Sequence, residues 1–243
     1  MTKRRMLEYS AVSAMAFALA LGLLVPAEQV QGHLSKMLFV HVPSIYLAYV
    51  AFAWTLVSSA AYLITKDLQW DRRAGASGEV GVFFTGLAIL LGMVWAKPTW
   101  GVWWTWDARL VLTAVMFFVY LGYVALRRAI PDRVLRARRS AVFGMLAIVQ
   151  IPIVHFSVIW WRTLHQPPSL VRPGEIQMDP PYVSALMFSL FAFTLVYLAL
   201  VNRRIALSLV EEQVEDAYLA ASTAVAGEAI TAPTLDALEL GDV

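Results

Sequence analysis

Six long apolar runs, almost free of charge, constrain this chain more than any other feature. With 60% hydrophobic and 15% charged residues, the composition is too apolar for a soluble domain. A transmembrane helix needs roughly 20 apolar residues, so the third and fourth runs must borrow flanking residues. We predict an all-α polytopic membrane protein with six transmembrane helices, at about residues 11–25, 42–64, 80–95, 110–126, 141–161 and 182–201.

The first run has two interpretations. Val25-Pro26-Ala27 loosely resembles the small-residue cleavage site of a signal peptide, and a basic cluster at residues 3–5 precedes the run. The proline makes the site a poor match, so we favour a retained first span. The remaining topology is the same in both cases.

The distribution of Lys and Arg predicts the orientation. Five of the 19 basic residues fall on one side of the predicted membrane: Lys36, Lys97, Arg109, Arg162 and Arg172. The other side receives Lys3, Arg4, Arg5, Lys66, Arg72, Arg73, Arg127, Arg128, Arg133, Arg136, Arg138, Arg139, Arg203 and Arg204. By the positive-inside rule, we expect both termini in the cytoplasm and a Trp-rich loop outside.

The basic segment between the fourth and fifth runs carries six arginines, from Arg127 to Arg139. We interpret it as a topology determinant that contacts anionic lipid; a docking site for a cytoplasmic protein is the alternative. Residues 1–204 form the predicted transmembrane domain. Residues 205–243 form an acidic, Ala-rich cytoplasmic tail, which we expect to extend the last helix briefly and then become partly disordered.

Two absences from the sequence narrow the possible functions. The chain has no cysteine, so it forms no disulfide, thiolate metal site or covalent thioether to haem. It also lacks the Gly-x-x-x-x-Gly-Lys-Ser/Thr phosphate loop, so we expect no nucleotide hydrolysis of that kind. The net charge of +2 gives no indication of nucleic-acid binding.

The loop between the third and fourth runs, residues 100–107, holds four of the nine tryptophans. If it is helical, Trp100, Trp103, Trp104 and Asp107 share one face and make a flat apolar shelf with an acid at its edge. The alternative is an aromatic belt, because Trp collects at membrane interfaces. A belt needs only one or two rings per helix end, which favours a dedicated binding surface.

All four histidines are expected on the outer side. His41 precedes Pro43 at the mouth of the second span, and His165 follows the fifth span just before Pro167 and Pro168. Each histidine could instead be an interfacial anchor. We interpret His155, which lies deeper, as mainly structural, and His33 as solvated.

Haem ligation is the chemistry that needs this combination. A haem is a flat apolar disc with two anionic propionates, and imidazole is a standard axial ligand of its iron. Indole rings suit the porphyrin. The five basic side chains on the outer side could pair with the propionates. Alternatively, Arg109 could simply pair with Asp107.

Three segments resemble signatures of the haem-handling membrane proteins of cytochrome c maturation. Residues 95–110, WAKPTWGVWWTWDARL, resemble their Trp-rich signature. The segments FVHVP at 39–43 and HFSVIWWRTLHQ at 155–166 resemble two signatures of the six-span CcmC family. The resemblance covers roughly residues 30–200, and the three motifs occur in the family's order. The tail beyond about Ile205 is outside the signature.

The resemblance implies a haem delivery role on the outer face of the cytoplasmic (inner) membrane. It implies haem b held non-covalently, with His41 and His165 as axial ligands of the iron. The implied partners are the periplasmic haem chaperone CcmE, the CcmA–CcmB ABC transporter and CcmD. The implied platform and its edge are Trp100, Trp103, Trp104, Trp106, Asp107 and Arg109.

Two other functions compete with haem delivery. A haem lyase would attach haem to apocytochrome, but such relatives carry more spans and a larger outer domain. A membrane electron-transfer protein with a b-type haem would pair histidines within the spans, where only His155 is a candidate. We therefore expect a delivery protein without catalytic residues or an ATPase of its own.

Overall fold

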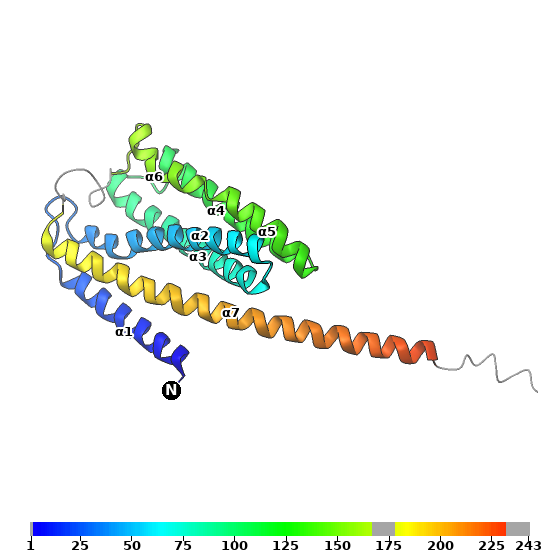
Figure 1. Cartoon of the computed structure of the whole chain (residues 1–243). Coiled ribbons are helices and arrows are strands. Elements are labelled where there is room, and N and C mark those ends of the chain that lie inside the picture. The colour runs from blue at the N-terminus through cyan, green and yellow to red at the C-terminus, as the bar shows by residue number, and fades with distance from the viewer. Residues whose placement is uncertain (1, 167–177, 232–243) are drawn as a thin grey trace, which may run out of the picture. The chain divides into compact units, whose positions relative to one another are not determined.

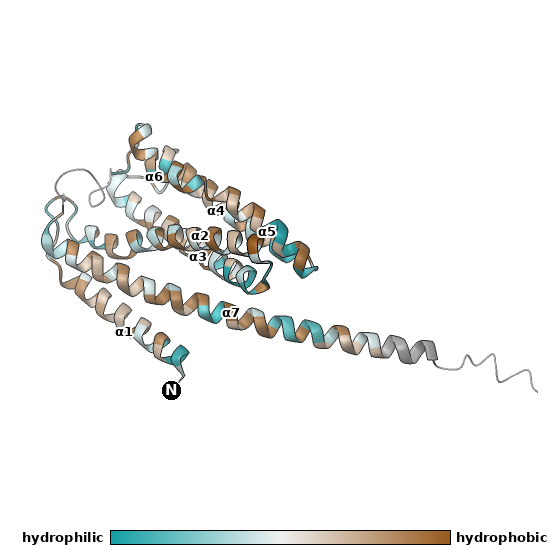
Figure 2. Ribbon diagram, in the orientation of Figure 1, coloured by the Kyte–Doolittle hydropathy of each residue, from teal (hydrophilic) through white to brown (hydrophobic). Residues whose placement is uncertain are grey.

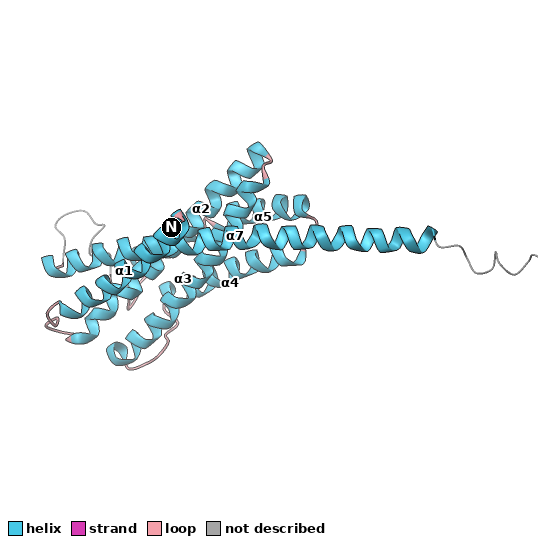
Figure 3. Cartoon of the chain, turned by 90° about the horizontal axis from the view of Figure 1, so that it is seen from below, coloured by secondary structure: helices cyan, strands magenta, loops and turns pink. Residues whose placement is uncertain are grey.

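The computed structural model describes residues 2–166 and 178–231. Contacts divide the chain into two compact units, Met1–Arg203 and Arg204–Val243. The described part contains helices joined by short loops, with no strand among them (Figure 3). The elements are α1 (Lys3–Leu24), a 3-10 helix η1 (His33–Met37), α2 (Leu38–Thr65), α3 (Leu68–Trp100), α4 (Ala108–Ala129), α5 (Arg133–Ala147), α6 (Gln150–Trp160) and α7 (Pro180–Thr231) (Figure 1).

Six candidate spans confirm the predicted all-α membrane architecture. Each is long and apolar enough to cross a bilayer, and α5 and α6 together supply one of them. Apolar residues dominate the middle of the helices, and polar residues gather around the turn between α4 and α5 (Figure 2). The chain is therefore a multi-pass membrane protein.

Two helices are much longer than their apolar runs. α3 begins at Leu68, twelve residues before the run at Val80, because the Asp67 side chain caps it by accepting the Gln69 N–H at 2.8 Å. α7 continues to Thr231, so the expected brief extension into the tail was wrong. Within the second unit, Arg204 and Glu211 form an ion pair of 3.0 Å on this helix.

Small residues let the central helices approach closely. A Cβ added to Gly78 on α3 would lie 2.7 Å from the Tyr123 ring of α4. The rings of Phe52 on α2 and Tyr120 on α4 stack with centroids 3.4 Å apart. Glycine at helix crossings is typical of membrane bundles, where close van der Waals contact drives association. These contacts hold α2, α3 and α4 together.

A buried ion pair lies at the end of the bundle that we call the Arg-rich end, where the α2–α3 and α4–α5 turns lie (Figure 1). Arg127 on α4 donates to both carboxylate oxygens of Asp71 on α3, at 2.5 and 2.8 Å. Gly75 leaves room for the guanidinium, since a Cβ there would lie 2.7 Å from it. Arg72 and Arg73, which follow Asp71 in sequence, also lie in α3.

The opposite end carries the loops that follow α1, α3 and α6, and we call it the Trp-rich end. Hydrogen bonds join its segments: Trp95 Nε1 donates to Gln31 at 2.9 Å, and the Tyr182 hydroxyl donates to the Pro26 carbonyl at 2.9 Å. α1 packs along the first part of α7 through Phe17 and Phe188, whose rings lie 4.9 Å apart. These contacts join segments from α1, α3 and α7 at this end of the bundle.

Candidate functional site

The Trp-rich loop is not helical. Gly101 ends α3 with a φ of 79°, in the left-handed region that favours glycine, and its N–H donates to the Lys97 carbonyl at 3.0 Å. Residues 102–107 then run without regular structure to the start of α4. The condition under which Trp100, Trp103, Trp104 and Asp107 would share one helical face is therefore not met.

The four tryptophans of the loop still offer apolar surface. Trp103 is 52% exposed and Trp106 is 87% exposed, while Trp100 and Trp104 are half-buried. Trp104 and Trp106 meet edge to face, with centroids 6.4 Å apart and an interplanar angle of 86°. Free indole faces thus remain available to a flat apolar molecule, although they do not form one flat shelf.

Asp107 joins the Trp-rich loop to the segment that carries His165. One carboxylate oxygen caps α4 by accepting the Arg109 N–H at 2.9 Å. The other accepts the N–H of Leu164, 57 residues further along the chain, at 2.7 Å. Asp107 therefore bridges two segments, and among the described residues its carboxylate makes no ion pair with the Arg109 guanidinium.

His165 lies half-buried beside this bridge. Burial, together with the nearby Arg109 guanidinium, lowers its pKa to about 4 from an ordinary 6.5. The ring is therefore neutral at pH 7. Its Nδ1 lies 3.1 Å from the Gln166 carbonyl oxygen, which can only accept, so Nδ1 carries the hydrogen. Nε2 then bears the lone pair that a metal ligand needs.

His41 lies in the first turn of α2 and faces α3. A Cβ added to Gly92 of α3 would lie 3.2 Å from the His41 ring, so the glycine makes space for the imidazole. The Trp95 ring packs edge-on against it with centroids 5.9 Å apart. The Nδ1 atom is buried without a hydrogen-bond partner. Because buried polar atoms are normally satisfied, this nitrogen is a candidate for a ligand contact.

Arg109 connects the histidines electrostatically. The half-buried guanidinium interacts with His41, His155 and His165, and His41 and His165 also interact with each other. His155 additionally packs edge-on against Tyr49, at 6.5 Å between centroids. The structure thus gathers three of the four histidines from three segments. His33 begins η1, and no described contact joins it to the other three.

The other basic side chains differ in availability. Lys36 donates to the Leu23 carbonyl at 2.5 Å, and Lys97 to the Gly101 carbonyl at 2.9 Å, so both are occupied by the backbone. Arg162 is exposed. Arg172 lies outside the described residues. Arg109 and Arg162 are therefore the described cations best placed to meet an anionic ligand.

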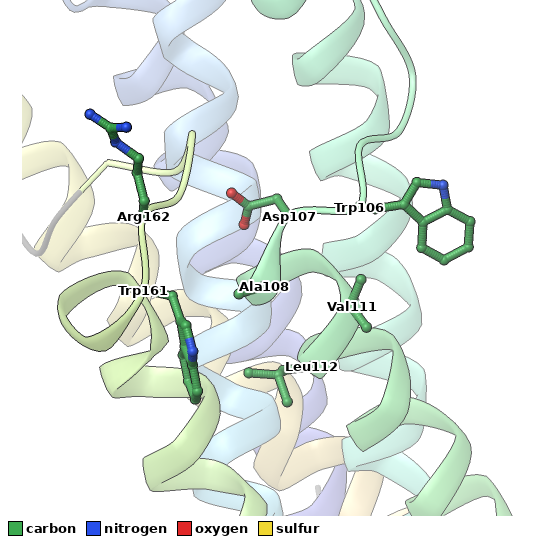
Figure 4. Close-up of a pocket in the computed structure, with 7 residues that line it drawn as sticks. All are labelled: Trp106, Asp107, Ala108, Val111, Leu112, Trp161 and Arg162. Atoms are coloured by element: carbon green, nitrogen blue, oxygen red, sulfur yellow. The ribbon is translucent and has the colours of Figure 1, made fainter.

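An open pocket of about 590 Å³ lies between the Trp-rich loop, α4 and the end of α6. Figure 4 shows the Asp107 carboxylate near its centre, with Trp106 and Trp161 on opposite sides. The lining combines two indoles, an acid and a guanidinium over an aliphatic floor, a mixture suited to a flat ligand with polar groups. It is lined by Trp106, Asp107, Ala108, Val111, Leu112, Trp161 and Arg162.

Sequence reasoning missed three contributors to this site: Tyr49, Gly92 and Trp95. Gly92 had a visible signal, because an isolated glycine inside an apolar helix often marks a close approach. Tyr49 lies in an apolar run with no neighbouring motif, and nothing in the sequence points to its contact with His155.

The CcmC family, described as "Heme exporter protein C", matches residues 2–220 of the chain. The chain belongs to the CcmC family. The match includes α1 and extends past Ile205, so it is wider than the region of resemblance noted in the sequence. This confirms the family indicated by the three motifs.

Curated relatives support the same assignment to the CcmC family. Heme exporter protein C of Bradyrhizobium diazoefficiens is 38% identical over 192 residues, which cover 77% of this chain and 73% of the relative. Its counterpart in Escherichia coli K12 is 35% identical over 170 residues, covering 70% and 68%. An Arabidopsis thaliana protein, named as ccmC-like, mitochondrial and of cytochrome c biosynthesis, is 34% identical over 208 residues, covering 84% and 78%.

Proposed function

We propose that this CcmC-family protein binds haem b non-covalently at the Trp-rich end and delivers it to the haem chaperone CcmE during cytochrome c maturation. The observation that supports the proposal is that His41 and His165, from two distant segments, lie close enough to interact electrostatically, at the end of the bundle that also carries the exposed indoles. Two imidazoles next to an apolar surface suit a haem with axial ligands on both faces.

Different side chains are proposed to contact different parts of the haem. His41 and His165 supply the axial nitrogens, and the orphaned Nδ1 of His41 fits that role because it lacks a partner within the protein. The indoles of the loop, Trp100, Trp103, Trp104 and Trp106, provide apolar contact for the porphyrin. Asp107 positions the His165 segment through Leu164.

Arg109 and Arg162 would pair with the propionates. A guanidinium presents two parallel N–H donors to a carboxylate, which makes it the best side chain for this contact. The interaction of Arg109 with both axial candidates places a fixed positive charge close to the iron ligands. That charge also disfavours protonation of His165, which keeps its lone pair available.

We further propose that the Trp-rich end faces the periplasm, in the inner membrane. The Lys and Arg distribution supports this orientation. The protein then works with the CcmA–CcmB transporter and CcmD. Because the sequence lacks a phosphate loop, we assign ATP hydrolysis to the transporter and no catalytic residue to this chain.

The absorption spectrum of the protein purified in detergent tests this proposal. We expect a low-spin, bis-histidine haem spectrum in the wild type, which is lost or changed to high spin in His41→Ala and in His165→Ala. His155→Ala is the matched control, because His155 also interacts with Arg109 but is not assigned to the iron. A wild-type spectrum in both axial variants would overturn the ligand assignment.

Loading of the chaperone tests delivery separately from binding. The measurement is the amount of haem bound to CcmE in cells that also produce CcmA, CcmB and CcmD. We expect loading to disappear in both axial variants and to persist in His155→Ala. Undiminished loading without this protein would refute the delivery role.

A further inference from the structure

A second pocket, of about 430 Å³, lies on α5 at the Arg-rich end. Two guanidinium groups and two aliphatic side chains line it: Leu135, Arg138, Arg139 and Val142. None of them belongs to the histidine site, which lies at the Trp-rich end. We propose that this pocket binds an anionic phospholipid, with the phosphate at the arginines and an acyl chain along α5.

The two arginines are available for a ligand. Both are exposed, and neither makes a hydrogen bond or ion pair with another residue in the part of the chain that the structure describes. Arg127, at the same end of the bundle, is instead fully occupied by Asp71. Two adjacent guanidinium groups that lack a carboxylate partner complement a phosphate, which they can bind in a bidentate manner.

The pocket lies at the depth where lipid phosphates lie. α5 and α6 form one candidate span, with a turn at Ile148 and Val149 between them, and the helical rise per residue gives a length of about 30 Å from Arg139 to Trp160. This matches the thickness of the hydrocarbon core, which is about 30 Å. With Trp160 at one interface, as Trp commonly is, Arg139 lies at the level of the headgroups on the other.

An apolar strip leads from the pocket into the membrane. Val142 is 48% exposed, Leu146 is 70% exposed and Val149 is 58% exposed. Val142 and Leu146 follow Arg138 at helical spacing and share one face of α5, and Val149 lies in the turn that follows α5. An acyl chain would continue along this strip from a phosphate held at the arginines.

The combination of two arginines with an adjoining apolar strip favours a lipid over a cytoplasmic protein as the ligand. An acidic protein segment would be attracted by the two charges, but it would leave the aliphatic strip, which runs into the hydrocarbon, unused. A phospholipid can contact the arginines and the strip together, because its charged headgroup and its acyl chain are joined at the membrane interface. The positive charge selects an anionic lipid over a zwitterionic one.

Native mass spectrometry of the intact protein in detergent tests the site. The probes are phosphatidylglycerol and phosphatidylcholine of the same chain length, added at equal concentration. We expect at least fivefold more bound phosphatidylglycerol in the wild type, and equal binding of the two lipids in the Arg138→Gln/Arg139→Gln double variant. Arg128→Gln is the matched control, because Arg128 is exposed at the end of α4 but does not line the pocket.

A variant in the strip tests the acyl-chain half of the proposal. Leu146→Ser keeps both arginines, and we expect it to weaken binding of phosphatidylglycerol at least twofold. Equal lipid preference in the wild type and the double variant would overturn the proposal. An equal loss of preference in Arg128→Gln would also overturn it, because net charge alone would then explain the effect. Circular dichroism of each variant checks that the helices are intact.

Discussion

The carboxylate of Asp107 accepts the backbone N–H of Leu164 at 2.7 Å. Its other oxygen caps α4 at the Arg109 N–H, at 2.9 Å. One side chain therefore ties the beginning of α4 to the segment that carries His165. Both hydrogen bonds end on a charged acceptor, which makes them stronger than neutral ones.

Replacement of Asp107 by alanine should damage both the helix cap and the site. We expect a loss of about 1 kcal/mol of stability from the cap, and at least a tenfold weaker affinity for haem because the His165 segment loses its attachment. Asp107→Asn should be intermediate, since the amide offers one accepting oxygen instead of two. Thermal unfolding and haem titration measure the two effects.

Asp132 offers the control for that experiment. It caps α5 at the Arg-rich end by accepting the Leu135 N–H at 2.6 Å. Asp132→Ala should therefore reduce the stability of the protein about as much as Asp107→Ala does, and it should leave the affinity for haem unchanged. If both variants lose haem equally, the Asp107 effect is only a general loss of stability.

A methyl group added at Gly92 should displace His41. The new Cβ would lie 3.2 Å from the imidazole, closer than ordinary van der Waals contact allows, so the ring must shift by a few tenths of an ångström. We expect Gly92→Ala to change the haem spectrum and to weaken binding several-fold. A Cβ added at Gly122 on α4 would have no neighbouring atom within 4 Å, so Gly122→Ala should leave the haem spectrum and the haem affinity unchanged. Identical spectra for the two variants would contradict this role of Gly92.

Breaking the buried pair of Asp71 and Arg127 should destabilise the bundle strongly. Either Asp71→Asn or Arg127→Met leaves a buried group without its partner, at a cost of about 3–5 kcal/mol. The double variant Asp71→Leu/Arg127→Met should recover most of this loss, because neither charge remains buried. Thermal unfolding in detergent measures all three. Single variants as stable as the double variant would show that the pair is not coupled.

Haem binding should depend on pH through His165. Because the folded site holds the pKa near 4, below the ordinary 6.5, protonation is penalised in the folded state. The stability of the segment is therefore complete above pH 6.5 and is lost as the pH falls towards 4. We expect unchanged haem binding between pH 7 and 8, with a midpoint of loss nearer to 4 than to 6.5.

Absorbance of the haem complex across this pH range is the measurement. His33→Gln should give the same curve, since no described contact links His33 to the other histidines. A midpoint at 6.5 would mean that His165 is not held in the buried environment described above.

The spans could be predicted from the sequence because hydrophobicity over about 20 residues is a local property. The start of α3 was not predicted, because the polar segment around Asp71 lies outside the apolar run and is buried by pairing with Arg127, 56 residues away. The same limit applies to the Trp-rich loop. Its composition indicated a surface, but the left-handed turn at Gly101 decided how the rings are presented.

In the candidate site, too, local sequence features could be predicted and long-range contacts could not. The motifs indicated His41 and His165 as candidates, since residue type and order carry that information. The glycine at position 92 signalled a close approach, but the sequence did not show that His41 is its partner. The hydrogen bond between Asp107 and the Leu164 N–H depends on how the chain folds in three dimensions, so it could not be predicted from one sequence.

The two proposed axial ligands are held in place by different kinds of structure. His41 belongs to a helix packed closely against α3, whereas His165 lies on an irregular segment tied to α4 through one carboxylate. In the proposed complex, the His41 coordination bond would be anchored in the bundle. Among the described residues, the position of His165 would depend on the hydrogen bond between Leu164 and Asp107, so loosening that hydrogen bond would free the His165 side of the haem before the His41 side.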